Sequence, residues 1–119
     1  MTTLLITHPA SLLHLTPAGH PERPDRLRAV ERALEDERFA SLIRLEAPLG
    51  TFEQAALCHS PAHLQAVLSA APKEGLAHLD ADTTMSPGTL EAALRGVGGA
   101  VLAVDEVMSG RARSAFVAT

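Results

Sequence analysis

The sequence predicts an α/β fold whose strands form a parallel sheet. Short apolar runs of strand length stand near the start and at the end of the 119 residues. Amphipathic helical patterns separate these runs, and strands that alternate with helices favour layers around a parallel sheet. The longest helical pattern extends from Gly88 to about Ser109 and leads into the apolar run 114–119. An apolar strand in that position needs neighbouring strands, so a sheet is expected at the core.

The first half of the chain is predicted to contain two strands, a long loop and a helix. Leu4 to Thr7 is the first strand and Leu42 to Leu45 the second. Residues 8–23 form a loop with three His and three Pro, and loops of this length are usually functional or disordered. The helix begins at Pro24, with Asp25 in its first turn. Its apolar face is formed by Leu27, Val30 and Leu34.

The second half is predicted to be mainly helical. Thr51 to Gln54 matches a capping box and starts a short helix. Ser60-Pro61 is an N-cap followed by proline at the first helical position, and Ser86-Pro87 repeats this opening before the long helix. Residues 71–85 between these helices are expected to be irregular. The long helix carries an apolar stripe of Leu90, Leu94, Val97, Val101, Val104 and Met108.

Three glycines, Gly96, Gly98 and Gly99, lie inside the long helix. Each costs about 1 kcal/mol relative to alanine in a helix interior. The segment Gly96 to Val101 resembles part of a dinucleotide-binding fingerprint, but it lies within a helix rather than at a turn from strand to helix. Close packing of the helix backbone on a neighbouring sheet is the favoured explanation.

The composition excludes several classes of function. Aromatic residues make up 3% of the chain, with no Trp or Tyr, so the platforms that stack nucleic-acid bases are missing. The net charge of −4 argues against a phosphate-binding surface, so no direct nucleic-acid partner is expected. The first residues have neither the basic start nor the apolar length of a signal peptide or membrane span, and no membrane partner is expected. The single Cys58 suits the reducing cytoplasm, where we expect the protein to be located.

Cys58, His59 and His63 contain ligand types that zinc prefers. The helix that begins at Pro61 leaves His59 outside it, which predicts that His59 and His63 do not share a face. Histidines that are satisfied by backbone hydrogen bonds are therefore favoured over a metal site.

Two charged loops are candidates for chemistry. Arg26 lies in the first turn of its helix, where the macrodipole disfavours a cation. Either Arg26 has a distant partner, or Glu22 and Asp25 neutralise the arginines of this helix start. Asp80 and Asp82 precede the long helix and are able to cap N–H groups, bind a cation or accept hydrogen bonds from the amides of a ligand. No third carboxylate is near them in sequence, so a metal site of their own is not expected.

Three segments together resemble the start of the histone deacetylase superfamily, which includes acetoin-utilisation proteins and acetylpolyamine amidohydrolases. The H-P-E-x-P-x-R-L opening of that family is matched by His20-Pro21-Glu22-Arg23-Pro24-Asp25-Arg26-Leu27, which follows His14 and Gly19. Its H-x-x-x-[HY]-[LV] segment is matched by His59-Ser60-Pro61-Ala62-His63-Leu64. The third match is Leu79-Asp80-Ala81-Asp82-Thr83-Thr84, then Ser86-Pro87-Gly88-Thr89 and the helix rich in Ala and Gly.

The resemblance implies an arginase–deacetylase fold, with a parallel sheet and helices on both faces. Arg26 matches the arginine beside an internal channel, where its guanidinium would help acetate to leave. Asp82 matches the aspartate at the pocket rim that accepts hydrogen bonds from substrate amides, and Asp80 is the alternative if the loop is shifted. The first active-site loop, which shapes the rim, is matched by His20, Pro21 and Glu22.

The resemblance also implies the chemistry of the complete enzyme, which would hydrolyse an acetylated amine such as acetyl-lysine or an acetylpolyamine. Zinc would polarise the acetyl carbonyl and activate a water molecule. The catalytic histidines, zinc ligands and tyrosine of the family follow the segment seen here, so neither catalytic nor metal residues are expected in this chain. Residues 1–119 are thus expected to be the N-terminal fragment of one deacetylase-like catalytic domain, inactive and without zinc by itself.

Two other hypotheses stay open. The chain could be a non-catalytic association module whose apolar edge is a protein interface, for example in a homo-oligomer. It could also be a small metalloenzyme, which would require histidines from two distant loops to converge, namely His14, His20, His59 and His63.

Overall fold

The computed structural model describes residues 2–119 and shows the α/β fold that the sequence predicts. Its centre is a parallel sheet of three strands in the order β2-β1-β5. These strands are β1 (Thr3–Thr7), β2 (Ile43–Glu46) and β5 (Ser114–Ala118). Each strand lies within one residue of the apolar run that predicts it.

Helices and one small hairpin make up the other elements. Proline at the first position begins both α1 and α3, as predicted, because its missing N–H has no helical partner there. None of the helices in residues 2–119 combines the length and apolarity that crossing a membrane requires. The elements are η1 (Pro9–Leu13), α1 (Pro24–Ala33), η2 (Glu37–Phe39), α2 (Phe52–Ala55), α3 (Pro61–Ala70), β3 (Ala77–His78), β4 (Thr84–Met85) and α4 (Thr89–Met108).

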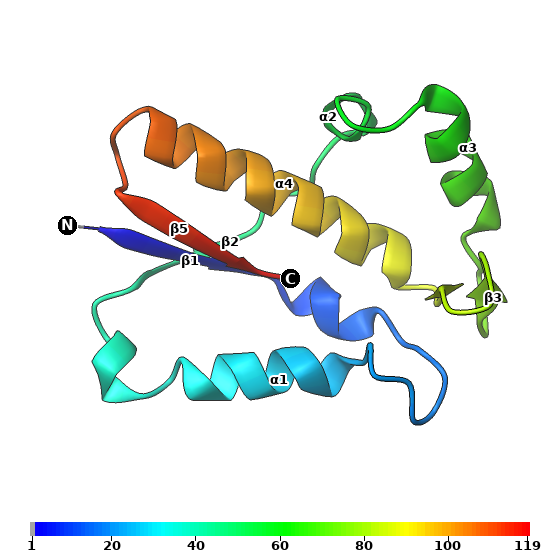
Figure 1. Cartoon of the computed structure of the whole chain (residues 1–119), viewed down its shortest axis with the longest axis horizontal. Coiled ribbons are helices and arrows are strands. Elements are labelled where there is room, and N and C mark those ends of the chain that lie inside the picture. The colour runs from blue at the N-terminus through cyan, green and yellow to red at the C-terminus, as the bar shows by residue number, and fades with distance from the viewer. Residues whose placement is uncertain (1) are drawn as a thin grey trace.

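The sheet has helices on both faces, which confirms the predicted architecture. The chain passes from β1 through α1 to β2 on one side of β1, and later reaches β5 on the other side through α4. Crossovers between parallel strands are right-handed, so crossovers that run in opposite directions place their helices on opposite faces. Figure 1 shows α1 on one side of the sheet and α4 on the other.

The core lies between the central strand and α4. Leu4, Leu5 and Ile6 of β1 are at most 4% exposed, as expected for a parallel strand that is covered on both faces. Leu4 and Ile6 form one buried cluster with Ala47, which follows β2, and Ala112, which precedes β5. Partly buried side chains of α4 pack against this cluster, namely Leu102, Ala103 and Val107.

Glycines let the backbone of α4 approach the sheet closely, as the sequence predicts. A Cβ atom at Gly98 would clash with the carbonyl oxygen of Pro48 and would lie 2.8 Å from the backbone nitrogen of Gly50. A Cβ atom at Gly99 would lie 3.1 Å from Cγ1 of Val117 in β5. The close approach explains why residues that weaken a helix occur in its interior.

The apolar stripe predicted for α4 does not face the sheet. Val104 and Met108 are 60% and 80% exposed. At about 100° per residue these two positions lie on the opposite side of the helix from Gly99, whereas Leu102 and Ala103 lie on its side. The prediction followed the large side chains, but the contact face is fixed by the glycines.

Two segments predicted to be irregular contain short regular elements. Within residues 8–23, η1 begins after His8, whose Nδ1 accepts a hydrogen bond from the N–H of Ala10 at 2.9 Å. Within residues 71–85, β3 and β4 form an antiparallel pair in which Ala77 lies opposite Met85. Elements this short carry too little periodicity to be predicted.

We expect Gly98→Ala to destabilise the fold by at least about 1–3 kcal/mol, because backbone atoms on the neighbouring loop cannot move aside. The matched control is Gly96→Ala, whose Cβ would lie 3.3 Å from Oγ1 of Thr119 at the end of a side chain. The control should be close to neutral, because the preference of the helix for alanine, about 1 kcal/mol, offsets the small adjustment of the Thr119 side chain. Urea denaturation of the two variants measures the difference, and equal stabilities would contradict the packing argument.

Candidate functional site

The residues predicted to be functional gather near the carboxyl ends of β1 and β5. The chain continues from β1 to β2 on one side and reaches β5 on the other, so β1 and β5 flank a switch point of the topology. At such a point the loops diverge and leave a crevice beyond the strand ends, where ligands of open α/β sheets bind. Residues 8–23 leave β1 at this crevice, and Thr119 follows β5 there.

A cavity of about 230 Å³ lies at this crevice. Its polar lining comes from η1, the loop after it, α1, α4 and the end of β5, and consists of Ser11, His14, Glu22, Arg26, Thr89 and Thr119. Five separate segments of the chain therefore contribute to one cavity. The predictions from sequence included Arg26 and Glu22 but did not include Ser11, because a single serine in a loop carries no signal of its own.

Ser86 fastens the loop of residues 8–23 to the start of α4. Its hydroxyl, in a residue only 1% exposed, donates to the carbonyl of Leu13 at 2.8 Å and accepts from the N–H of Leu15 at 2.9 Å. Thr89 reinforces this contact, since its Oγ1 accepts from the N–H of Ser86 and is 2.8 Å from Nδ1 of His14. Ser86 was predicted to open α4 as its N-cap, but Gly88 occupies the N-cap position and Ser86 binds the distant loop instead.

Arg26 is on the wall of the cavity and forms a local ion pair. Its Nε lies 3.4 Å from Oε2 of Glu22, one turn earlier, and both side chains are about half exposed. Of the two alternatives for this helix start, local neutralisation is therefore present for Arg26. Asp25 pairs with Arg28, at 2.8 Å, rather than with Arg26.

The predicted rim residues His20 and Asp82 are in direct contact. Nε2 of His20 lies 2.9 Å from Oδ1 of Asp82, although the two residues are 62 positions apart in sequence. The hydrogen bond with Asp82 raises the pKa of His20 above its ordinary 6.5. The part of the stabilisation that depends on the positive charge of His20 is thus fully present below pH 6.5 and is lost as the pH rises through the raised pKa.

Asp80 supports the same loop from within. Its Oδ1 accepts hydrogen bonds from the N–H groups of Asp82 and Thr83, both at 2.8 Å. These bonds, chiefly the one from Asp82, lower the pKa of the Asp80 carboxyl. Asp80 therefore has the capping role weighed from the sequence, whereas the side chain of Asp82 is 90% exposed.

Pro21 and Glu22 occupy the turn between these contacts. Both residues are exposed. The carbonyl of Glu22 accepts a hydrogen bond from the hydroxyl of Thr16, and its N–H donates to Nδ1 of His20 at 3.0 Å. The turn therefore holds His20 toward Asp82.

His59 and His63 are close together, which corrects the prediction that they do not share a face. Their ring centroids are 5.1 Å apart, with the planes tilted by 35°. Ser60 explains this arrangement, because it caps α3 through the N–H of His63 at 3.2 Å and thereby turns the preceding residue back toward the helix. Cys58 precedes this pair and is exposed.

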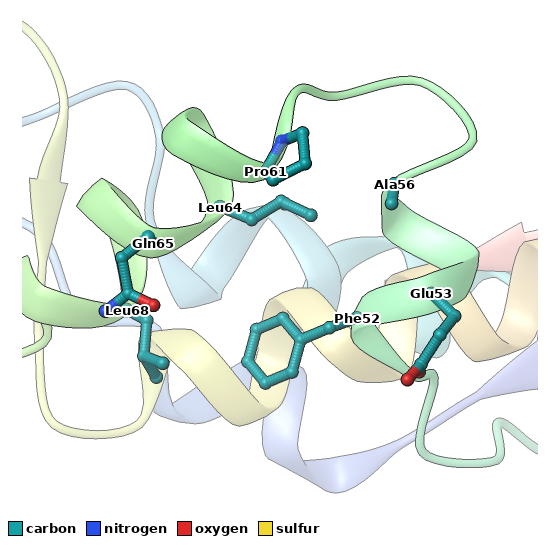
Figure 2. A pocket seen from close by; sticks show the side chains of 7 residues that line it. All are labelled: Phe52, Glu53, Ala56, Pro61, Leu64, Gln65 and Leu68. Carbon is teal, nitrogen blue, oxygen red and sulfur yellow. The ribbon is translucent and has the colours of Figure 1, made fainter.

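An apolar groove of about 380 Å³ lies between α2 and α3. Figure 2 shows the ring of Phe52 from α2 facing Leu64 and Leu68 of α3. Glu53 and Gln65 are the polar residues of its lining. The groove has no convergent set of polar groups, so it offers space but little chemistry.

The described residues do not fit a zinc site. Within residues 2–119, no three His, Cys, Asp or Glu side chains lie together in a way that could hold a metal ion. Zinc sites take three or four such ligands. The four histidines of the metalloenzyme hypothesis do not converge in the described part of the chain: His59 and His63 lie together, whereas His14 bonds to Thr89 and His20 to Asp82.

Comparison with known proteins identifies the family. The family model of the histone deacetylase domain matches residues 20–119, so the chain belongs to the histone deacetylase domain family. The crystal structure of the HDA15 HD domain has the same fold, with a TM-score of 0.90 and 24% sequence identity. That match covers 100% of this chain and 35% of the other, so the chain spans about a third of that relative's length. No curated protein matches the chain significantly.

Two buried serines provide a test of how the loop is held. Ser86→Ala should destabilise the fold by about 1–3 kcal/mol, because it leaves the carbonyl of Leu13 and the N–H of Leu15 without their partner. Ser11 is 6% exposed and its Oγ forms no hydrogen bond to any residue from 2 to 119, so Ser11→Ala should be neutral or slightly stabilising. Thermal unfolding of both variants measures the effects, and a loss of stability only in Ser11→Ala would refute this account.

Proposed function

We propose that this chain forms part of a hydrolase that removes acetyl groups from acetylated amines. Its family and the position of its crevice support this function. The observation that carries the proposal is the bond between His20 and Asp82, which joins two predicted rim segments at the edge of the crevice. The substrate is an acetyl-lysine or an acetylpolyamine, classes that share an acetylated primary amine.

In this proposal the described residues bind substrate and product, and the chemical step belongs to the complete domain. Zinc is expected as the cofactor of the complete protein, with ligands that lie outside residues 2–119. Asp82 is exposed at the rim, where its carboxylate is able to accept hydrogen bonds from substrate amides. Arg26 lines the cavity below, where its guanidinium suits a departing acetate. Asp80 supports Asp82 through the loop backbone.

The substrate role of Asp82 predicts a binding defect in the complete protein. Asp82→Asn should raise KM about tenfold and leave kcat within about twofold, since a hydrogen bond to a charged acceptor is lost from the ground and transition states alike. Steady-state hydrolysis of an acetyl-lysine peptide and of an acetylated polyamine provides the measurement. Asp105→Asn, on the exposed face of α4, is the matched control. A fall in kcat with KM unchanged would contradict the rim role.

The product role of Arg26 predicts weaker inhibition by acetate. Arg26→Gln should raise the acetate inhibition constant about tenfold, because a charged guanidinium–carboxylate contact is lost. The control is Arg28→Gln, two residues further along α1. It should leave the acetate inhibition constant unchanged, since Arg28 pairs with Asp25 at the surface. Inhibition measured over a series of acetate concentrations distinguishes the two variants. If both behave like the parent protein, acetate does not use this cavity.

An association role is the second candidate, favoured by an exposed apolar surface. A hollow of about 270 Å³ on α4 and β5 is lined by Ala103, Val104, Val107, Met108 and Ala115. On the opposite face of the edge strand β5 from Ala115, Phe116 is 51% exposed. Sedimentation of residues 1–119 tests this role: a defined dimer with cooperative melting supports association, and a polydisperse species that binds ANS supports a fragment.

A further inference from the structure

The contact between His20 and Asp82 uses both nitrogens of the imidazole ring. Nε2 lies 2.9 Å from Oδ1 of Asp82. Nδ1 accepts the N–H of Glu22 at 3.0 Å and lies 3.3 Å from the carbonyl oxygen of the same residue. The ring therefore connects two loops: the turn at Glu22 in residues 8–23 (the first loop) and the carboxylate of Asp82 in residues 79–83 between β3 and β4 (the second loop).

This geometry accommodates both protonation states of the ring. In the neutral state the N–H on Nε2 is donated to Asp82, and Nδ1 accepts from the N–H of Glu22. In the cationic state Nδ1 carries a proton as well and no longer accepts the N–H of Glu22, so the turn has to shift for the carbonyl oxygen of Glu22, 3.3 Å away, to become its acceptor, while Nε2 still donates to Asp82. Titration therefore changes the charge of the pair from zero to −1 with rising pH, while the hydrogen bond from Nε2 to Asp82 is available in both states.

We infer that His20 is a positioning residue that holds Asp82 at the rim, and that its protonation sets the charge that the rim presents to substrate. The inference rests on the proposed function and adds a property to it. Substrates with a second cationic group are favoured when His20 is neutral, because Asp82 is then uncompensated. Neutral substrates respond little, because Asp82 is held in both states.

The surrounding charges leave His20 as the titrating group. Asp82 contacts the ring directly, and the charged groups nearest this contact in the hydrogen-bond network are Asp80, which binds the N–H of Asp82, and Glu22, which pairs with Arg26. Carboxylates and guanidinium groups ordinarily keep their charges between about pH 6 and 8.5, whereas imidazoles titrate there. The hydrogen bond to Asp82 raises the pKa of His20, which brings its titration further into this range.

The test compares two acetyl-lysine peptides that differ at one neighbouring position, lysine in one and norleucine in the other. In the complete protein, the ratio of KM for the lysine peptide to KM for the norleucine peptide should fall roughly threefold from pH 6 to 8.5, the effect of one unit charge a few ångströms away in water. The midpoint should lie above 6.5. In His20→Gln, which keeps an N–H donor but does not titrate, the ratio should be flat.

The control is His78→Gln, which removes another exposed imidazole, on β3 next to the second loop, and should keep the parent's pH profile. A flat ratio in the parent protein, or a profile retained in His20→Gln, would overturn the inference. If neither peptide is hydrolysed, the proposed function fails, and NMR titration of labelled histidines decides on the contact itself. A pKa of His20 above 6.5 that falls in Asp82→Asn supports the contact, and an unchanged pKa overturns it.

Discussion

The enclosure of β1 is the constraint on which the rest of the structure depends. Both edges of this strand are paired, with β2 on one side and β5 on the other, and Leu4, Leu5 and Ile6 are buried. A strand enclosed in this way requires two crossovers in opposite directions, and their shared handedness places α1 and α4 on opposite faces. The same geometry opens a crevice at the carboxyl end of β1. The position of the candidate site therefore follows from the way the core is closed.

The loop after β1 acquires its shape from contacts far away in sequence. One hydroxyl, that of Ser86, binds the backbone of this loop on both sides of His14. These two bonds fix residues 13–15 of the loop to the segment that leads into α4, next to the cavity. His20 fixes the later part of the loop to Asp82. The cavity and the rim thus share one loop, so the shape of both depends on the contacts that hold this loop.

Local signals in the sequence were sufficient for most of the fold. Proline and capping residues marked the starts of α1, α2 and α3, and apolar runs marked the three strands of the main sheet. The orientation of α4 could not be predicted in the same way, because its contact face is defined by the missing side chains of Gly98 and Gly99. Large side chains indicate which faces of a helix are apolar, but not which of them meets the sheet.

The site was predictable by residue type but not by contact. The motifs identified His20, Asp82 and Arg26, and nothing in the sequence indicates that the first two bond across 62 positions. Ser11 has no motif, and its place in the cavity depends on how η1 turns after β1. Such pairings are set by the tertiary fold, which local patterns do not encode.

The two aspartates of the second loop differ in how far their carboxylate oxygens are already used as hydrogen-bond acceptors. One oxygen of Asp80 already accepts two backbone N–H groups, so this carboxylate is used to shape the loop. Asp82 receives support from both ends: Asp80 binds its N–H, and His20 binds one oxygen of its side chain. The second oxygen belongs to a side chain that is 90% exposed. A carboxylate that is held in this way and still open to solvent is suited to accept hydrogen bonds from a ligand, because little side-chain freedom remains to be lost on binding. The geometry therefore favours Asp82 over Asp80 for the proposed rim role.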